Sequence, residues 1–186
     1  ILISDYMMNY YRSYLPQDRM TRIYNGVSLP ESTERKTENR VKERLKVAII
    51  GVICAQKNQL ELLKAQSLLH QQDIDIDTYI IGTNKKEYLQ QVETYIQKHD
   101  LSKYVHIMGH QDDIFAILQE MNLGIVCATD AAFGRTTIEF MLMKMPVVVS
   151  NSGANAELIR NEQDGYIYPS GDANSLANAI KRYATQ

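Results

Sequence analysis

The stretch with the clearest chemical potential is residues 130–139, with the sequence DAAFGRTTIE. An apolar run over residues 123–128 precedes it, and Pro146 limits the helix that should follow, so the pattern predicts strand, short turn and helix. The first N–H groups of a helix have no partner within the helix and carry partial positive charge. A turn of this kind therefore favours an anion.

Glu139 is a carboxylate within an otherwise apolar helical segment, and two interpretations are open. An unpaired buried carboxylate costs several kcal/mol in practice, so the residue needs a partner. It could form a surface pair with Arg135, four residues earlier, worth only ~0.2–0.5 kcal/mol. Alternatively, it could accept hydrogen bonds from the hydroxyl groups of a ligand.

The elements that must position these residues begin at Leu45, where apolar segments start to alternate with helical ones. Asn58 followed by Glu61 predicts a helix with a capping box, and Asp112 is the expected cap of a later helix. The expected strands are 45–51, 77–82, 105–108, 123–128, 146–150 and 166–168, and the later helices 85–99, 112–121, 135–144, 154–160 and 175–183. Continuous apolar strands separated by helices indicate an α/β domain with a doubly wound, parallel, six-stranded, Rossmann-like sheet.

Ligands of such sheets bind beyond the carboxyl ends of the strands, where the strand order reverses. The loops expected there contain one cation, Lys57, and three helix starts. They also contain amides and hydroxyls, at Asn84, Gln111, Thr136, Thr137, Asn151 and Asn155. This set suits a diphosphate joined to a polar group, although Lys57 could equally be a solvated loop lysine. Neither G-x-G-x-x-G after a strand nor a phosphate-binding G-x-x-x-x-G-K-[ST] motif occurs.

The composition narrows the class of protein. The chain has 186 residues, 45% of them hydrophobic, and a net charge of −2, which allows a real core and argues against a nucleic-acid-binding protein. Cys54 and Cys127 are too few for a disulfide framework and predict a reducing, cytosolic environment. Together with the histidines, including His106 and His110, they lack the spacing of metal ligands. The sequence has no signal-peptide pattern and no apolar run long enough to cross a bilayer.

The first 44 residues lack the strand–helix alternation that begins at Leu45. Because the chain begins at Ile1 and residues 1–30 do not resemble the start of a domain, we expect a piece of a longer protein. Tyr6, Tyr10 and Tyr14 recur every four residues, which predicts a helix packed by one face on another surface. Residues 20–24 are a candidate short strand. Residues 31–44 are almost entirely polar and predict an exposed linker or hairpin, and residues 45–186 form the Rossmann-like domain.

Several motifs, taken in order, resemble one known family. They are the loop ending Lys57-Asn58-Gln59, residues 105–109 followed by Asp112-Asp113, FGRTTIE at 133–139, PVVVSNSG at 146–153, and AELI, DG and GD after it, at 156–159, 164–165 and 171–172. The set is similar to the C-terminal domain of retaining GT-B glycosyltransferases, which include sucrose synthase and bacterial mannosyl- and glucosyltransferases. Residues 23–27 (IYNGV) extend the resemblance, which covers roughly residues 21–183. Each motif alone is weak, but the ordered set is specific.

The resemblance implies a two-domain hexosyltransferase, of which residues 45–186 would bind the nucleotide-diphosphate sugar. Residues 1–30 would be the tail of the N-terminal, acceptor-binding domain together with the connection between the domains. The acceptor would be a glycan or a lipid-linked glycan of polysaccharide synthesis, and the fragment alone would be inactive. The family needs no cofactor or metal ion. The full protein would be cytoplasmic, with peripheral association at the inner face of the membrane.

The resemblance also implies roles for individual residues. Lys57 would neutralise the departing diphosphate, and Glu139 would bind the ribose, so these two are the expected catalytic residues. The expected donor-binding residues are Gly51, Lys57, His110, Gln111, Asp130, Phe133, Gly134, Arg135, Thr136 and Glu139. Of these, His110 and Gln111 lie where the family contacts the base, and the backbone of Phe133 and Gly134 would face the sugar and phosphates.

Two positions depart from the family pattern. The first glutamate of the family's E-x7-E motif falls at Ala131, next to Asp130, and an arginine of the family falls at Val52. A charge-assisted hydrogen bond contributes ~1.5–3 kcal/mol, so losing that arginine could slow transfer on the order of 10–100-fold. The alternatives to an active transferase are a relative that only binds a nucleotide sugar or a partner, and a nucleotide-sugar epimerase. The F-G-x4-E pattern of residues 133–139 argues against the epimerase.

Overall fold

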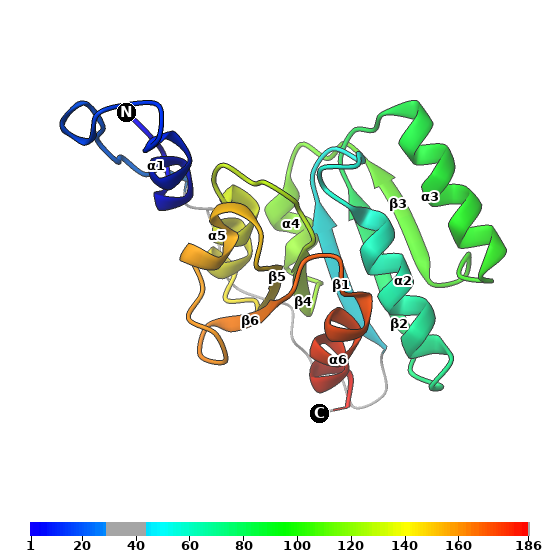
Figure 1. The fold of residues 1–186 in the computed structure, drawn as a ribbon. Coiled ribbons are helices and arrows are strands. Elements are labelled where there is room, and N and C mark those ends of the chain that lie inside the picture. Colours follow the sequence, from blue (N-terminus) through cyan, green and yellow to red (C-terminus); the bar gives the residue numbers. More distant parts are fainter. Residues whose placement is uncertain (29–43, 186) are drawn as a thin grey trace.

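The computed structural model describes residues 1–28 and 44–185 of the chain (Figure 1). The predicted polar linker over residues 31–44 lies outside the described residues, apart from Arg44. The described residues form a six-stranded sheet with helices on both faces, preceded by a short N-terminal segment that lies against one end of the sheet domain (Figure 1).

The sheet has the order β3-β2-β1-β4-β5-β6, and every neighbouring pair is parallel. The strands are β1 (Leu45–Ile50), β2 (Ile76–Ile81), β3 (Val105–Gly109), β4 (Leu123–Val126), β5 (Val147–Ser150) and β6 (Gly165–Tyr168). The chain builds outward from β1 to β3, returns to place β4 beside β1, and then builds outward to β6. The predicted doubly wound, Rossmann-like α/β fold is confirmed, and its switch point lies between β1 and β4.

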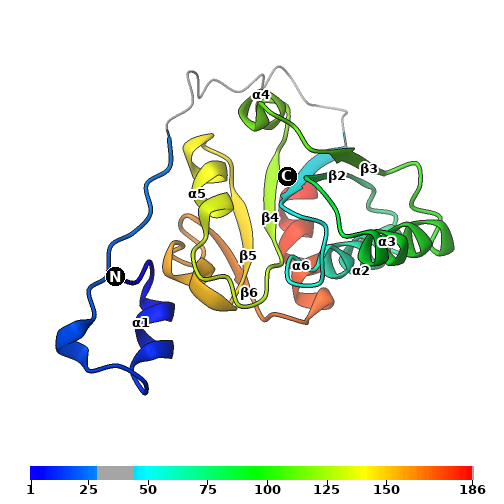
Figure 2. The same cartoon turned by 90° about the horizontal axis from the view of Figure 1, so that it is seen from above.

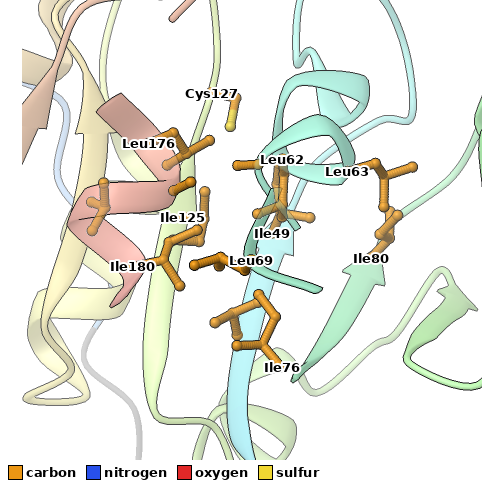
Figure 3. Close-up of a cluster of buried hydrophobic side chains, with 14 of the residues drawn as sticks. Ile49, Leu62, Leu63, Leu69, Ile76, Ile80, Ile125, Cys127, Leu176 and Ile180 are labelled. Carbon is orange, nitrogen blue, oxygen red and sulfur yellow. The ribbon is translucent and has the colours of Figure 1, made fainter. Parts of the chain in front are cut away.

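Alternate residues of the buried strands face two separate cores. Val47 and Ile49 of β1 pack against α2 (Gln59–His70), α3 (Lys86–Lys98) and α6 (Ala173–Ala184). Figure 3 shows Ile49 and its neighbours meeting the leucines of α2 in this first core. Ala48 faces the second core, which is covered by α4 (Ile114–Leu118) and α5 (Arg135–Leu142), as Figure 2 shows from above. Strands buried on both faces explain why the sequence reads as continuous apolar runs.

The packing of α5 on the sheet is unusually close. A Cβ atom on Gly124 of β4 would lie 2.3 Å from the ring of Phe140, so the ring rests directly on the strand backbone. Phe140 is fully buried. The contact sets the position of α5, and therefore of its first turn, relative to the end of β4.

The starts of two helices differ from the prediction. Asn58 precedes α2 but adopts a left-handed backbone with φ of 53° and makes no side-chain cap. The expected capping box is wrong, because the carboxylate of Glu61 binds other groups, described below. For α4 the cap is Asp113 rather than Asp112, and its Oδ1 accepts from the Ala116 N–H at 3.0 Å. The predicted helix at 154–160 is a 3-10 helix, η2 (Gly153–Glu157).

The N-terminal segment contains α1 (Asp5–Tyr11) and a 3-10 turn, η1 (Gln17–Arg19). Tyr14 lies beyond the end of α1, so the predicted three-tyrosine helix face is shorter than expected. No strand forms over residues 20–24; the backbone of Arg22 makes only an isolated bridge to Leu2. The helix α1 packs against η2 (Figure 1).

Candidate functional site

The candidate site lies at the carboxyl ends of β1 and β4, on the two sides of the switch point. β1 is followed by Gly51, whose φ of +138° is accessible to glycine and strained for other residues. A Cβ atom on neighbouring Gly82 would lie 2.3 Å from the Gly51 carbonyl oxygen. Both glycines are therefore needed for the chain to leave the sheet at this point.

Lys57 lies over the glycine at the end of β1. A Cβ atom on Gly51 would come within 3.0 Å of Lys57 Cε, so the lysine stem occupies the space that the glycine leaves open. Lys57 is half-buried. The Cys54 carbonyl accepts from the N–H groups of Lys57 and Asn58, at 3.0 and 3.1 Å. The backbone and stem of Lys57 are thus held near the strand end.

Gln59 holds the loop between β1 and Lys57 by two hydrogen bonds, and this role was not predicted from the sequence. Its side chain is fully buried. Its Oε1 accepts from the Cys54 N–H at 3.3 Å, and its Nε2 donates to the Val52 carbonyl at 3.1 Å. Since both backbone groups belong to the loop before Lys57, Gln59 fixes the loop's shape. The one sequence signal was an amide two residues after the lysine, at the start of a helix.

Glu61 is a second buried polar residue whose role the sequence reasoning missed. One oxygen accepts from Asn58 Nδ2 at 2.6 Å, and the other accepts from the Gly171 N–H at 2.6 Å. Burial raises the pKa of this carboxyl, while the bond from Gly171 opposes the rise. Glu61 therefore ties the Lys57–Asn58 turn to the loop between β6 and α6, 110 residues away.

The turn after β4, here called the donor turn (residues 130–134), is fixed by the adjacent loop after β5. Asp130 has φ of +55°, and its N–H donates to Ser152 Oγ at 3.0 Å. The Ala131 carbonyl accepts from the Ala154 N–H at 2.7 Å. A Cβ atom on Gly153 would lie 2.4 Å from Ala131 N, so the two backbones are in contact.

The two loops of the switch point are also joined to each other. The Thr129 N–H donates to the Gln56 carbonyl at 2.9 Å. Gln56 directly precedes Lys57, and Thr129 directly precedes the donor turn. The loop that carries Lys57 and the loop that leads into α5 are therefore adjacent, as the topology rule predicts.

The start of α5 is not capped by a side chain, because its cap position is Gly134. A Cβ atom there would lie 2.6 Å from Leu158 Cδ1. Thr137 is buried, and its hydroxyl donates to Asn155 Oδ1 at 3.4 Å, whereas Thr136 is half-buried. An uncapped helix start offers N–H donors and partial positive charge to an anion.

Glu139 forms an ion pair with Arg135, which was one of the two interpretations of its role. Its Oε1 lies 3.0 Å from Arg135 Nε, with the Glu139 side chain 12% exposed and that of Arg135 72% exposed. The Glu139 carboxylate is largely covered. Because the Arg135 side chain is exposed, another hydrogen-bond donor could take its place at the carboxylate. Its predicted contact with a ribose remains a prediction.

His110 and Gln111 lie at the same rim of the sheet but at its far edge. His110 Nε2 lies 3.5 Å from Asp112 Oδ1, and Gln111 Nε2 donates to the Met108 carbonyl at 2.8 Å. β3 is separated from β4 by three inter-strand spacings, roughly 14 Å. β1, which precedes Lys57, lies two strand positions from β3, so His110 and Gln111 lie toward the other edge of the sheet.

The two cysteines are free and buried, in agreement with their interpretation as small apolar residues. Burial raises the pKa of the Cys127 thiol to about 12. Among residues 1–28 and 44–185, no group of three or more His, Cys, Asp or Glu side chains could hold a metal ion. No described helix is long and apolar enough to cross a membrane.

Fold and site together define a Rossmann-like domain in which a loop lysine and an uncapped helix start lie on the two sides of the switch point. The sequence model of the family "Glycosyl transferases group 1" matches residues 30–186, and the chain belongs to that family. This membership bears out the predicted resemblance and does not favour the binding-only or epimerase alternatives.

Among curated proteins, the chain is 22% identical over 178 residues to the Escherichia coli UDP-Gal:alpha-D-GlcNAc-diphosphoundecaprenol alpha-1,3-galactosyltransferase, covering 91% of this chain and 46% of that protein. It is 27% identical over 175 residues to the amylovoran biosynthesis glycosyltransferase AmsK of Erwinia amylovora, covering 90% and 42%. The Anabaena protein HepE, solved with UDP and glucose, shares the fold with a TM-score of 0.85, at 20% identity over 97% of this chain and 52% of that one. The chain thus spans less than half the length of these two curated relatives.

Proposed function

We propose that the crevice between the ends of β1 and β4 binds the diphosphate of a nucleotide-sugar donor, and that the chain supplies the donor-binding half of a sugar transferase. The observation that carries the proposal is the placement of Lys57 over Gly51, joined through the Gln56–Thr129 hydrogen bond to the uncapped start of α5. A cation and a helix start facing one crevice suit a diphosphate. HepE, which shares the fold, was solved with UDP and glucose.

The family resemblance suggests how the donor lies. We place the base near His110 and Gln111, the ribose at Glu139, the diphosphate at Lys57, and the sugar against the backbone of the donor turn. Arg135 would be displaced from Glu139 or would share its carboxylate when the ribose hydroxyls bind.

Transfer of a hexose with retention of configuration is the activity that we propose for the full protein. Lys57 and the start of α5 would stabilise the negative charge that develops on the leaving diphosphate, without a metal ion. The acceptor would be a glycan or a lipid-linked glycan, bound by a second domain that approaches the same crevice. The relatives of polysaccharide biosynthesis, such as AmsK, support this class of acceptor. We propose a cytoplasmic protein, with peripheral association at the inner face of the membrane.

A thermal-shift series with UDP, GDP and ADP tests donor binding on the chain as it stands. We expect at least one nucleotide at millimolar concentration to raise the unfolding temperature, because a ligand that binds only the folded state stabilises it. The variant Glu139→Ala should lose the shift, whereas Glu93→Ala, an exposed carboxylate on α3, should keep it. No shift with any of the three nucleotides would refute the donor site.

A further inference from the structure

The N-terminal segment touches the donor turn at three points, although more than 100 residues separate the two in sequence. Ser4 Oγ donates to the Ala132 carbonyl at 2.6 Å, and the Tyr6 hydroxyl donates to Asp130 Oδ1 at 3.2 Å. The rings of Tyr24 and Phe133 lie 6.0 Å apart, centre to centre. The segment therefore contacts the residues that face the proposed donor.

Glu157 holds α1 in the position from which it makes these contacts. Its two carboxylate oxygens accept from the backbone N–H groups of Asp5, at 2.8 Å, and Tyr6. Glu157 is the last residue of η2, which begins at the glycine that contacts the Ala131 backbone. The same short element thus fixes α1 on one side and the donor turn on the other (Figure 1).

Ser4 is the most constrained of the contacting residues. It is fully buried, and its hydroxyl serves two functions, because it accepts from the Met7 N–H at 3.1 Å while donating to Ala132. Removal of the hydroxyl would leave the Ala132 carbonyl without this donor. Asp130 is exposed and has a left-handed backbone, so the donor turn depends on such contacts for a single conformation.

We propose that Ser4 and Tyr6 are positioning residues of the donor site and that Glu157 acts by docking α1, so that nucleotide affinity depends on a docked N-terminal segment. The inference rests on the proposed function, because it concerns the same crevice. Preorganisation of a binding turn raises affinity by removing the cost of ordering it. A second domain connected through this segment would thereby influence donor binding without touching the donor.

The test compares three variants with matched controls, using the chain as it stands. Tyr6→Phe is paired with Tyr10→Phe, an exposed tyrosine on the same helix whose ring lies near those of Tyr11 and Tyr14. Glu157→Gln is paired with the exposed Glu93→Gln, and Ser4→Ala with the exposed Ser102→Ala. Calorimetric titration with UDP gives the dissociation constant, and amide hydrogen exchange without nucleotide reports on the donor turn.

We expect the dissociation constant for UDP to rise about fivefold in each of Ser4→Ala, Tyr6→Phe and Glu157→Gln, in line with the loss of one hydrogen bond. The amides of residues 130–134 should also exchange faster, while those of β1 and β2 and all three controls stay unchanged. Those unchanged strands separate a local effect from general destabilisation.

Equal UDP affinity in wild type and all three variants would overturn the inference and leave the proposed function standing. If the wild-type chain itself does not bind UDP, the proposed function fails for this nucleotide. In that case amide exchange alone tests the positioning role. Unchanged exchange at residues 130–134 in Ser4→Ala and Glu157→Gln overturns that role. Faster exchange confined to the donor turn upholds it.

Discussion

Replacement of Lys57 by methionine removes the ammonium group but keeps a stem of similar length over Gly51. The loop should keep its shape, since its carbonyl and amide contacts run through Cys54 and Gln59 rather than through the lysine side chain. The change therefore isolates the charge. In the proposed function, that charge faces the diphosphate.

The expected magnitude follows from the partly exposed position of Lys57. Two unit charges 4 Å apart attract by about 4 kcal/mol at the effective dielectric constant of a protein surface, before desolvation of either group is counted. Hydrogen bonds to charged groups contribute a net ~1.5–3 kcal/mol. At about 1.4 kcal/mol per factor of ten, the dissociation constant for UDP should rise roughly 10–100-fold.

Isothermal titration with two ligands separates this effect from general damage. UDP should bind roughly 10–100-fold more weakly to Lys57→Met, whereas uridine, which has no phosphate, should bind both proteins alike. Lys98→Met, an exposed lysine in the last turn of α3, removes the same charge elsewhere and should change neither affinity. Equal losses for UDP and uridine, or no loss for UDP, would refute the assignment of Lys57 to the diphosphate.

Three further predictions concern other parts of the site. Val52 is 40% exposed, so the fold should accommodate Val52→Arg. In a titration, the added guanidinium should lower the dissociation constant for UDP about tenfold. Unchanged binding would show that the position does not reach the donor. The raised pKa of Glu61 means that its contribution to stability is full below its ordinary value of 4.5 and is lost as pH rises through the folded-state value. The unfolding temperature of wild type should therefore fall relative to that of Glu61→Gln as pH rises above about 4.5, and a flat difference between pH 4 and 8 would contradict this reasoning. Gly82→Ala places a Cβ atom 2.3 Å from the Gly51 carbonyl oxygen. The free energy of unfolding should fall by about 1–3 kcal/mol, which calorimetry would record as an unfolding temperature roughly 2–12 °C lower. An unchanged unfolding temperature would mean that the strand ends can separate.

Much of the fold could be predicted because its determinants are local. Continuous apolar runs over residues such as 47–50 and 147–149 can be satisfied only by strands covered on both faces, and the helices between them force parallel pairing. Helix boundaries were less predictable. Asp112 and Asp113 are adjacent carboxylates, and the sequence contains nothing that decides which of them caps α4.

The residues that support the site could not be predicted, because their partners are distant in sequence. Glu61 looked like a capping residue, yet it accepts from Gly171, whose approach depends on how α6 packs beside α2. Gln59 was predicted only as the last residue of a family motif, although its amide holds the loop in front of Lys57. A buried polar group must find a partner, but the sequence does not say which one.

The amino-acid sequence was enough to predict the strand–helix alternation, a site beyond the carboxyl ends of the strands, and the residue types in the loops there. These follow from hydrophobic period and from the geometry of parallel sheets. The fold in three dimensions was needed to show that Glu61 binds the Gly171 N–H, that Glu157 docks α1, and that Ser4 contacts the donor turn. The physical reason is that these contacts join groups whose separation is set by packing of whole elements, and such distances are not encoded in any local pattern.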